Sequence, residues 1–314
     1  MAHPAGERQP RIAIAGLATS HPFSDAATIG RLRPGAAFDV WDADTDRVAE
    51  FERRNPGHHA HDRLTDLVDR KPDGIILTVR PDQVAAALDV LLPLGVPVFV
   101  NKPAAATRSQ LRDLTARCEP VAHRVLTSSV LRFAAPVARL AGRLDRDRVL
   151  SARAVVRHDV GRWAQGSTPW QDDPSVGGGA IVTMGLHGVE LLVALLGRQA
   201  RTVAATSARR VYPTLRSADS ATLLLNWADG VQGTVDVVGA AKTESYGVSV
   251  ETADGPIGFD LPDGSADPFG YARTVEEFLA MVEVGAPSPV AWPETVAILD
   301  LLISAVELES RSSR

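Results

Sequence analysis

The feature that most constrains the fold is an alternation, through the first 127 residues, of short apolar runs with stretches of helical periodicity. The run Gly74–Val79 is apolar almost throughout, as expected of a strand buried on both faces of a parallel sheet. Strands that alternate with helices in this way predict a doubly wound α/β domain. The runs that we expect to be strands are Arg11–Ala15, Ala37–Trp41, Gly74–Val79, Val96–Val100 and Arg124–Thr127.

The pattern changes after about residue 130. An irregular segment, 158–179, precedes an expected helix at Ala180–Leu196. Short strands then follow one another, and the dipeptides Asp229-Gly230 and Asp254-Gly255 between them are hairpin signals. We therefore expect an α/β domain at residues 1–127 and an α+β domain with a mostly antiparallel sheet at residues 128–314. Its expected strands and helices are Val149–Arg157, Val203–Val211, Ala221–Trp227, Val231–Val238, Val248–Thr252, Tyr271–Glu283 and Pro293–Leu308.

The composition excludes several classes of protein. The 314 residues are 45% hydrophobic and 23% charged, which is typical of a globular chain and not of a disordered one. A net charge of −5 indicates no basic surface for nucleic acid. One cysteine, Cys118, cannot form an internal disulfide or a cysteine metal cluster. With no signal-like start and no expected membrane span, we predict a cytoplasmic protein.

The turn after the first strand reads Gly16-Leu17-Ala18-Thr19-Ser20-His21, where a dinucleotide-binding turn would read G-x-G-x-x-G. Only the first glycine is present. Ala18 is small enough for a pyrophosphate to approach, and Thr19 and Ser20 add hydroxyl groups at a helix N-terminus. The alternative is an ordinary strand–turn–helix joint that Ser20 or His21 caps.

A carboxylate, Asp42, ends the second strand, 26 residues after Gly16. It is placed to bind the ribose of an adenosine and to repel a 2′-phosphate, which favours NAD over NADP. The alternative is a turn aspartate that precedes a helix.

Asn101-Lys102-Pro103 follows the fourth strand, so Lys102 lies at the carboxyl edge of the sheet, where ligands of open α/β folds bind. Lysine is rare in this chain, since 30 of its 33 basic residues are arginine. Further along, His187 is four residues after Thr183 and three before Glu190, so one helix would place them on one face. A histidine there is suited to move a proton near neutral pH, although a buried core histidine is the alternative.

These motifs in this order resemble the Gfo/Idh/MocA oxidoreductases, over nearly the whole chain. The resemblance rests on the turn after the first strand, Thr78 near the end of the third, N-K-P after the fourth and the G-G-G…H-G-V-E segment. It implies a Rossmann domain, a second domain with an open, mostly antiparallel sheet, and hydride transfer between a nicotinamide and a sugar or cyclitol. It also implies that Lys102 and His187 are catalytic, and that the Lys102–Pro103 bond is cis.

The chain departs from the family pattern at three points. The glycine turn keeps one glycine, Asn101 replaces a glutamate, and Thr183 replaces an aspartate one helical turn before His187. A threonine is not able to raise the pKa of the histidine as a carboxylate does, so we expect from it only a weak orienting role.

We expect an NAD-dependent dehydrogenase that acts on CH–OH groups, with Thr78 and Asn101 among the cofactor contacts. The alternatives are redox-neutral chemistry on a tightly held cofactor and a catalytically silent sensor that binds a sugar or nucleotide. Arg132, Trp163 and Trp170 are candidate substrate contacts, with loop packing as the alternative for both tryptophans. We expect a homodimer or homotetramer that associates through the open face of the second sheet.

Overall fold

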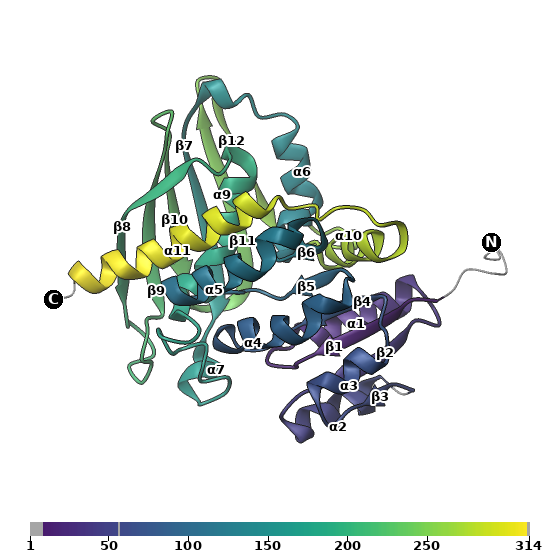
Figure 1. The fold of residues 1–314 in the computed structure, drawn as a ribbon. Helices are drawn as coiled ribbons and strands as arrows, with labels where there is room; N and C mark the ends of the chain where they lie inside the picture. The colour runs from purple at the N-terminus through teal and green to yellow at the C-terminus, as the bar shows by residue number, and fades with distance from the viewer. Residues whose placement is uncertain (1–8, 56, 313–314) are drawn as a thin grey trace.

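The computed structural model describes residues 9–55 and 57–312, which form two adjoining sheets with their helices (Figure 1). The first sheet has six strands, all paired in parallel, in the order β3-β2-β1-β4-β5-β6. This is the doubly wound arrangement that the sequence predicts. Its strands are β1 (Arg11–Ala15), β2 (Ala37–Trp41), β3 (His59–Ala60), β4 (Gly74–Leu77), β5 (Val98–Val100) and β6 (Val125–Leu126).

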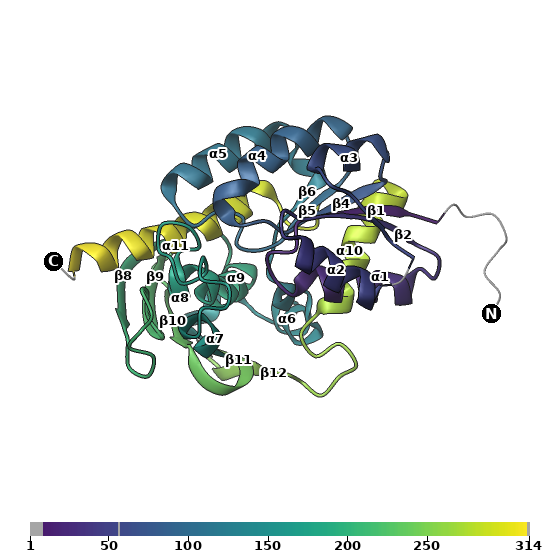
Figure 2. The ribbon, with the colours of Figure 1, turned by 90° about the horizontal axis from the view of Figure 1, so that it is seen from below.

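Helices cover both faces of this sheet (Figure 2). On one face lie α3 (Leu64–Asp69), α4 (Pro81–Leu91) and α5 (Arg108–Cys118), and on the other lie α1 (His21–Leu32), α2 (Thr45–Arg54) and α10 (Tyr271–Val284). Local signals define several helix starts. The Asp44 side chain caps α2 by accepting hydrogen bonds from two backbone N–H groups, and Thr107 with Gln110 forms the expected capping box of α5.

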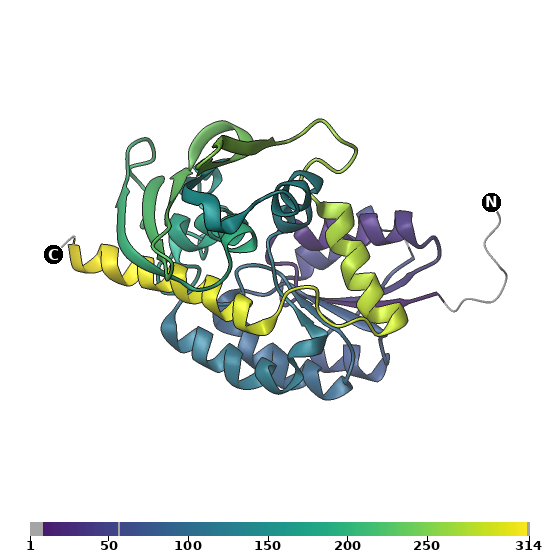
Figure 3. The ribbon, with the colours of Figure 1, turned by 90° about the horizontal axis from the view of Figure 1, so that it is seen from above.

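Helix α10 comes from the C-terminal half of the chain but packs on the first sheet, beside α1 (Figure 3). Its Phe278, Leu279 and Met281 belong to the same buried cluster as Ile12 and Phe99. A division of the chain at residue 127 therefore does not describe every contact, because one face of the first sheet is completed by a helix almost 150 residues later. Apolar periodicity predicts α10 but does not tell which sheet it covers.

The second sheet also has six strands, in the order β12-β11-β7-β10-β9-β8, and only β7 and β10 pair in parallel. The expected mostly antiparallel sheet is confirmed. Its strands are β7 (Val149–Asp159), β8 (Ala200–Ala208), β9 (Ser220–Trp227), β10 (Gln232–Val238), β11 (Ala240–Thr252) and β12 (Gly255–Leu261).

Two helices, α9 (Gly185–Leu196) and α11 (Trp292–Ser312), lie against one face of this sheet (Figures 1 and 3). Gly188 lets α9 approach closely, because a Cβ at that position would lie 2.5 Å from Val235. The other face is polar in part: Asp236 accepts hydrogen bonds from Arg153 and Thr222 there. Segment Gly179–Leu196 is apolar and long enough to cross a membrane, but it is 94% buried inside the fold, as a core helix is.

The expected helix at Ala180–Leu196 is in fact two helices. Helix α8 (Gly179–Thr183) ends at Thr183, and Met184 separates it from the start of α9. Thr183 and His187 therefore lie on different helices, and the argument that one helix face carries both is wrong.

Candidate active site

The turn between β1 and α1 keeps its glycine for a steric reason. Gly16 has φ +90°, and a Cβ there would lie 2.6 Å from the carbonyl oxygen of Thr78. The N–H of Ala18 donates to that same oxygen at 2.9 Å, which draws the turn onto β4. The backbone N–H groups of Thr19 and Ser20 donate to no residue that the structure describes. The turn thus presents free N–H groups at the start of α1, the arrangement that binds a pyrophosphate.

Asp42 lies beside this turn, at the carboxyl end of β2. Its carboxylate accepts hydrogen bonds from the N–H of Leu17 and, at 2.7 Å, from the N–H of Asp44. Asp42, Arg47 and Ala18 line a cavity of about 960 Å³ above the carboxyl ends of the strands. A dinucleotide's adenosine fits a cavity of this size and position.

Three polar side chains connect the ends of the neighbouring strands. The side-chain amide of Asn101 donates to the hydroxyl of Thr78 at 2.7 Å and to the carboxylate of Asp25, on α1, at 3.3 Å. All three are buried. Burial raises the pKa of Asp25 to about 7, against the opposing effect of the Asn101 hydrogen bond. Sequence reasoning missed Asp25 because it lies inside an ordinary helical pattern.

Lys102 follows Asn101 at the carboxyl edge of the sheet, and its peptide bond to Pro103 is cis, as predicted. It forms no hydrogen bond or ion pair with any residue in the described part of the chain. Burial lowers the pKa of its ammonium group to about 8, the nearby Glu244 opposes this shift, and Arg162 adds to it. A lysine with this pKa is able to accept and donate a proton near neutral pH.

His187 lies in the first turn of α9 and is 4% exposed. Its Nδ1 lies 2.6 Å from the hydroxyl of Ser129, which is completely buried. Burial lowers the pKa of His187 well below its usual value, and the charge of Lys102 lowers it further. The imidazole is therefore neutral at physiological pH.

The structure does not bring Thr183 to His187. The Thr183 hydroxyl donates instead to the carbonyl oxygen of Gly177 at 3.1 Å, because the chain bends between α8 and α9. The expected orienting role of Thr183 is therefore wrong. The contact to His187 comes from Ser129, which directly follows the first domain and which no motif singled out.

Arg132 is not free to contact a substrate. Its guanidinium group lies 2.6 Å from Glu294 and 3.8 Å from the buried Glu190, and is only 16% exposed. Burial raises the pKa of Glu190 to about 7, although Arg132 and the hydrogen bonds from Ser128 and the N–H of Ser129 oppose the shift. These residues form a structural network behind His187, which corrects the expectation for Arg132.

The two tryptophans of the irregular segment have different environments. Trp163 is 3% exposed and its indole N–H donates to Gln171 at 2.9 Å, so it packs in the interior and cannot stack on a sugar. Trp170 is half-buried and lines the same cavity as Asp42. The second domain therefore contributes a wall to the cofactor-sized cavity, and the expectation of a sugar platform is not supported for either residue.

Several residues that sequence reasoning did not single out surround Lys102 and His187. The ring of Tyr246 lies 5.3 Å from that of His187, and its hydroxyl donates to Glu244 at 2.6 Å. The charge of Arg162 lowers the pKa of Lys102, and the charge of His158 lowers the pKa of His187. His21, which the sequence does single out as the last residue of the candidate cofactor turn, lies 6.1 Å from the ring of Tyr271, and burial with the charge of Lys102 lowers its pKa to about 3.

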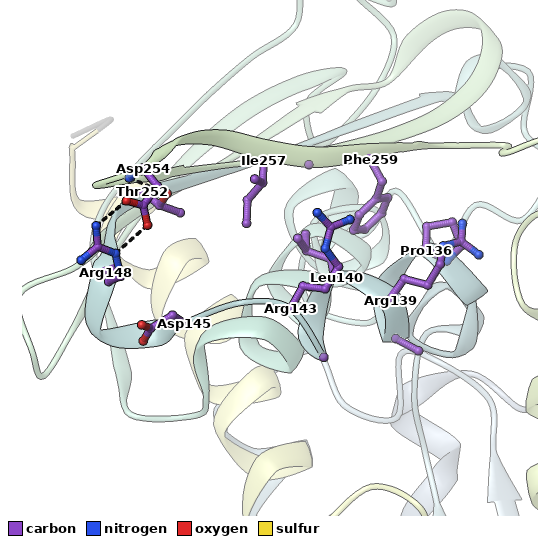
Figure 4. A pocket seen from close by; sticks show the side chains of 13 residues that line it. Pro136, Arg139, Leu140, Arg143, Asp145, Arg148, Thr252, Asp254, Ile257 and Phe259 are labelled. Atoms are coloured by element: carbon purple, nitrogen blue, oxygen red, sulfur yellow. Dashed lines mark hydrogen bonds and ion pairs between the residues drawn. The ribbon is translucent and has the colours of Figure 1, made fainter.

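A second hollow, of about 830 Å³, lies elsewhere, between α6 (Ala135–Ala141) and β12 (Figure 4). Arg148 pairs there with Asp254, and Arg139 lies 3.4 Å from Asp263. This hollow lacks the buried titratable groups found around Lys102. Among the described residues, no three His, Cys, Asp or Glu side chains gather closely enough to hold a metal ion.

Comparisons with known proteins agree with this fold. Residues 147–255 match the family described as the GFO/IDH/MocA C-terminal domain. GenD2 from gentamicin A biosynthesis, solved with NAD, has a TM-score of 0.83 at 20% identity, covering 100% of this chain and 97% of its own. A myo-inositol dehydrogenase from Corynebacterium glutamicum has a TM-score of 0.80 at 16% identity, covering 97% and 98%.

The WlbA dehydrogenase from Chromobacterium violaceum, solved with NADH and UDP-GlcNAcA, has a TM-score of 0.82 at 18% identity and covers 100% of this chain and 97% of its own. No curated protein sequence matches the chain significantly. The fold combines a Rossmann-like parallel sheet with a second, mostly antiparallel sheet, and the candidate active site lies at the carboxyl edge of the first sheet. The match of residues 147–255 to the GFO/IDH/MocA C-terminal domain and the shared fold of these neighbours confirm the resemblance of the chain to the Gfo/Idh/MocA oxidoreductases.

Proposed function

We propose that the chain is an NAD-dependent oxidoreductase that transfers a hydride between a nicotinamide and a CH–OH group of a sugar, cyclitol or related polyhydroxylated substrate. The observation that carries the proposal is the environment of Lys102. This lysine is desolvated, lacks a partner among the described residues, and lies at the sheet edge next to a phosphate-binding type of turn. The cofactors and substrates named for the structural neighbours support the same class of reaction.

The residues around the turn fit NAD. The free N–H groups of Thr19 and Ser20 would bind the pyrophosphate, and the Asp42 carboxylate would accept a hydrogen bond from the ribose. Trp170 would cover the adenosine end from the second domain. Bound NAD would supply the acceptor for the hydride.

The protein's own residues would manage the hydroxyl proton. Neutral Lys102 accepts the proton from the substrate hydroxyl as the hydride leaves, and it returns the proton in the reverse reaction. His187 stays neutral and hydrogen-bonds the same oxygen. The sequence motifs favour His187 as the acid/base, whereas the pKa directions of the two residues favour Lys102 in that role.

Incubation with a panel of sugars and cyclitols plus NAD, with NADH formation as the readout, tests the proposal. The variant Lys102→Met should lose turnover while it keeps NAD-induced thermal stabilisation. Lys71→Met is the matched control, since Lys71 is exposed and lies just before β4, at the opposite edge of the sheet. Binding without any turnover would favour the sensor, and substrate conversion without NADH release would favour redox-neutral chemistry.

A further inference from the structure

We infer that Ser129 is the positioning residue of His187, and that it donates its hydroxyl proton to Nδ1 so that the neutral imidazole carries its own proton on Nε2. The inference deepens the proposed function and rests on it for its catalytic meaning. Its geometric basis is independent of that function.

The contact between the Ser129 hydroxyl and Nδ1 of His187 is short, and both residues are buried from solvent. The oxygen of Ser129 lies 2.6 Å from Nδ1 of His187, and the two residues are 0% and 4% exposed. The two atoms come from residues 58 positions apart, one at the junction after β6 and the other in α9. The contact therefore joins the segment that follows the last strand of the first sheet to helix α9, which packs on the second sheet.

The direction of the hydrogen bond follows from the other partner of the hydroxyl. Ser129 already accepts the N–H of Leu131 at 3.2 Å, and His187 is the one other side chain or backbone group bonded to this oxygen in the described part of the chain. If Nδ1 were the donor, the hydroxyl proton of Ser129 would be buried without an acceptor, at a cost of about 1–3 kcal/mol. When the hydroxyl donates to Nδ1 instead, its proton has an acceptor and no buried donor is left without a partner.

Ser129 is itself held in place. Its N–H donates to the carboxylate of Glu190 at 2.7 Å, and the neighbouring Ser128 hydroxyl donates to the other oxygen of that carboxylate. Arg132 lies 3.8 Å from Glu190. The network behind His187 thus fixes the serine, and the serine fixes the ring.

This arrangement gives His187 a different task from that of a histidine paired with a carboxylate. A carboxylate beside Nδ1 would accept the proton of that nitrogen and leave Nε2 as a base. Here Thr183 is bonded to Gly177, and the Ser129 hydroxyl leaves the proton on Nε2. His187 is then a hydrogen-bond donor to the substrate oxygen, and Lys102 takes the proton.

The test is a ¹⁵N NMR measurement on histidine-labelled protein without cofactor or substrate, at about pH 8, where the imidazole is neutral. His187→Gln assigns the resonances. We expect Nδ1 of His187 to be unprotonated and shifted by a hydrogen bond, with the shift lost in Ser129→Ala and kept in Ser129→Thr. Ser310→Ala is the control, because its hydroxyl donates to the Val306 carbonyl within α11 and belongs to neither His187 nor its network.

A protonated Nδ1 in the unchanged protein would overturn the inference, and so would an unaltered Nδ1 resonance in a folded Ser129→Ala variant. Because the spectrum needs no turnover, these outcomes are distinct from a failure of the proposed function. In the active enzyme, Ser129→Ala should lower kcat by about 3- to 10-fold, the range expected for one hydrogen bond, and Ser129→Thr should recover most of it.

Discussion

Lys102→Arg should remove the pH dependence that we attribute to the lysine. Burial lowers the pKa of Lys102 from 10.5 to about 8. At pH 7 a lysine of pKa 8 is unprotonated in about 9% of molecules, against about 0.03% for an ordinary lysine, so the site holds roughly 300 times more of the basic form. An arginine keeps the charge and the length but does not deprotonate in this range.

The assay is kcat/KM for oxidation of the best substrate, measured from about pH 6 to about pH 10. For the unchanged protein we expect a rise with an apparent pKa near 8, followed by a plateau. Lys102→Arg should be slower by about 10²–10⁴-fold and lack this rise. The reasoning is refuted if the unchanged protein shows a flat profile, or if the same rise persists in Lys102→Arg.

Asp42→Ser should narrow the preference for NAD over NADP, measured as the ratio of the two dissociation constants, because a 2′-phosphate then no longer faces the Asp42 carboxylate while Arg47 stays in the same cavity. Equal affinities in the unchanged protein would contradict this. Asp25 has a folded pKa of about 7 against 3.8 unfolded, so its contribution to stability is full below about pH 4 and is lost as the pH rises to 7. In denaturant titrations at different pH values, the free energy of unfolding should therefore fall by up to about 4 kcal/mol between pH 4 and pH 7 on account of Asp25, and Asp25→Asn should remove this fall. The same pH dependence in the variant would refute the assignment. Light scattering should show a dimer or tetramer at micromolar concentration, and a monomer would contradict the proposed self-association. If the open face of the second sheet is the interface, Asp236→Lys on that face should weaken the association of the subunits.

The sequence predicts five of the six strands in each sheet, because the first sheet's strands are short apolar runs and the second sheet's strands contain apolar residues between turn signals. It does not predict β12, Gly255–Leu261, in which polar and exposed residues alternate with partly buried ones. It misses β3, because this strand consists of two residues, His59 and Ala60, which are both exposed and give no apolar signal. It also misses the break at Met184, since an apolar pattern continues across it without proline. Whether the chain bends there depends on tertiary contacts that no local pattern contains.

The candidate site could be predicted where a residue follows a strand end. Gly16, Asp42 and Lys102 are at such positions, and the structure brings them to one edge of the sheet. Ser129 also follows a predicted strand, but its role comes from contact with His187, 58 residues further on, which no local pattern contains. Glu244 lies within β11 and follows no strand end. Arg132 and Trp163 have the right chemistry for a ligand but are already paired inside the protein.

The central claim is that this chain passes a hydride between a polyhydroxylated substrate and NAD. The most direct measurement uses a substrate deuterated at the reacting carbon, with mass spectrometry of the recovered cofactor. The account predicts that one deuterium appears in the nicotinamide of NADH, and that Lys102→Met suppresses its appearance. Tight binding of NAD and substrate with no deuterium in the cofactor would contradict it.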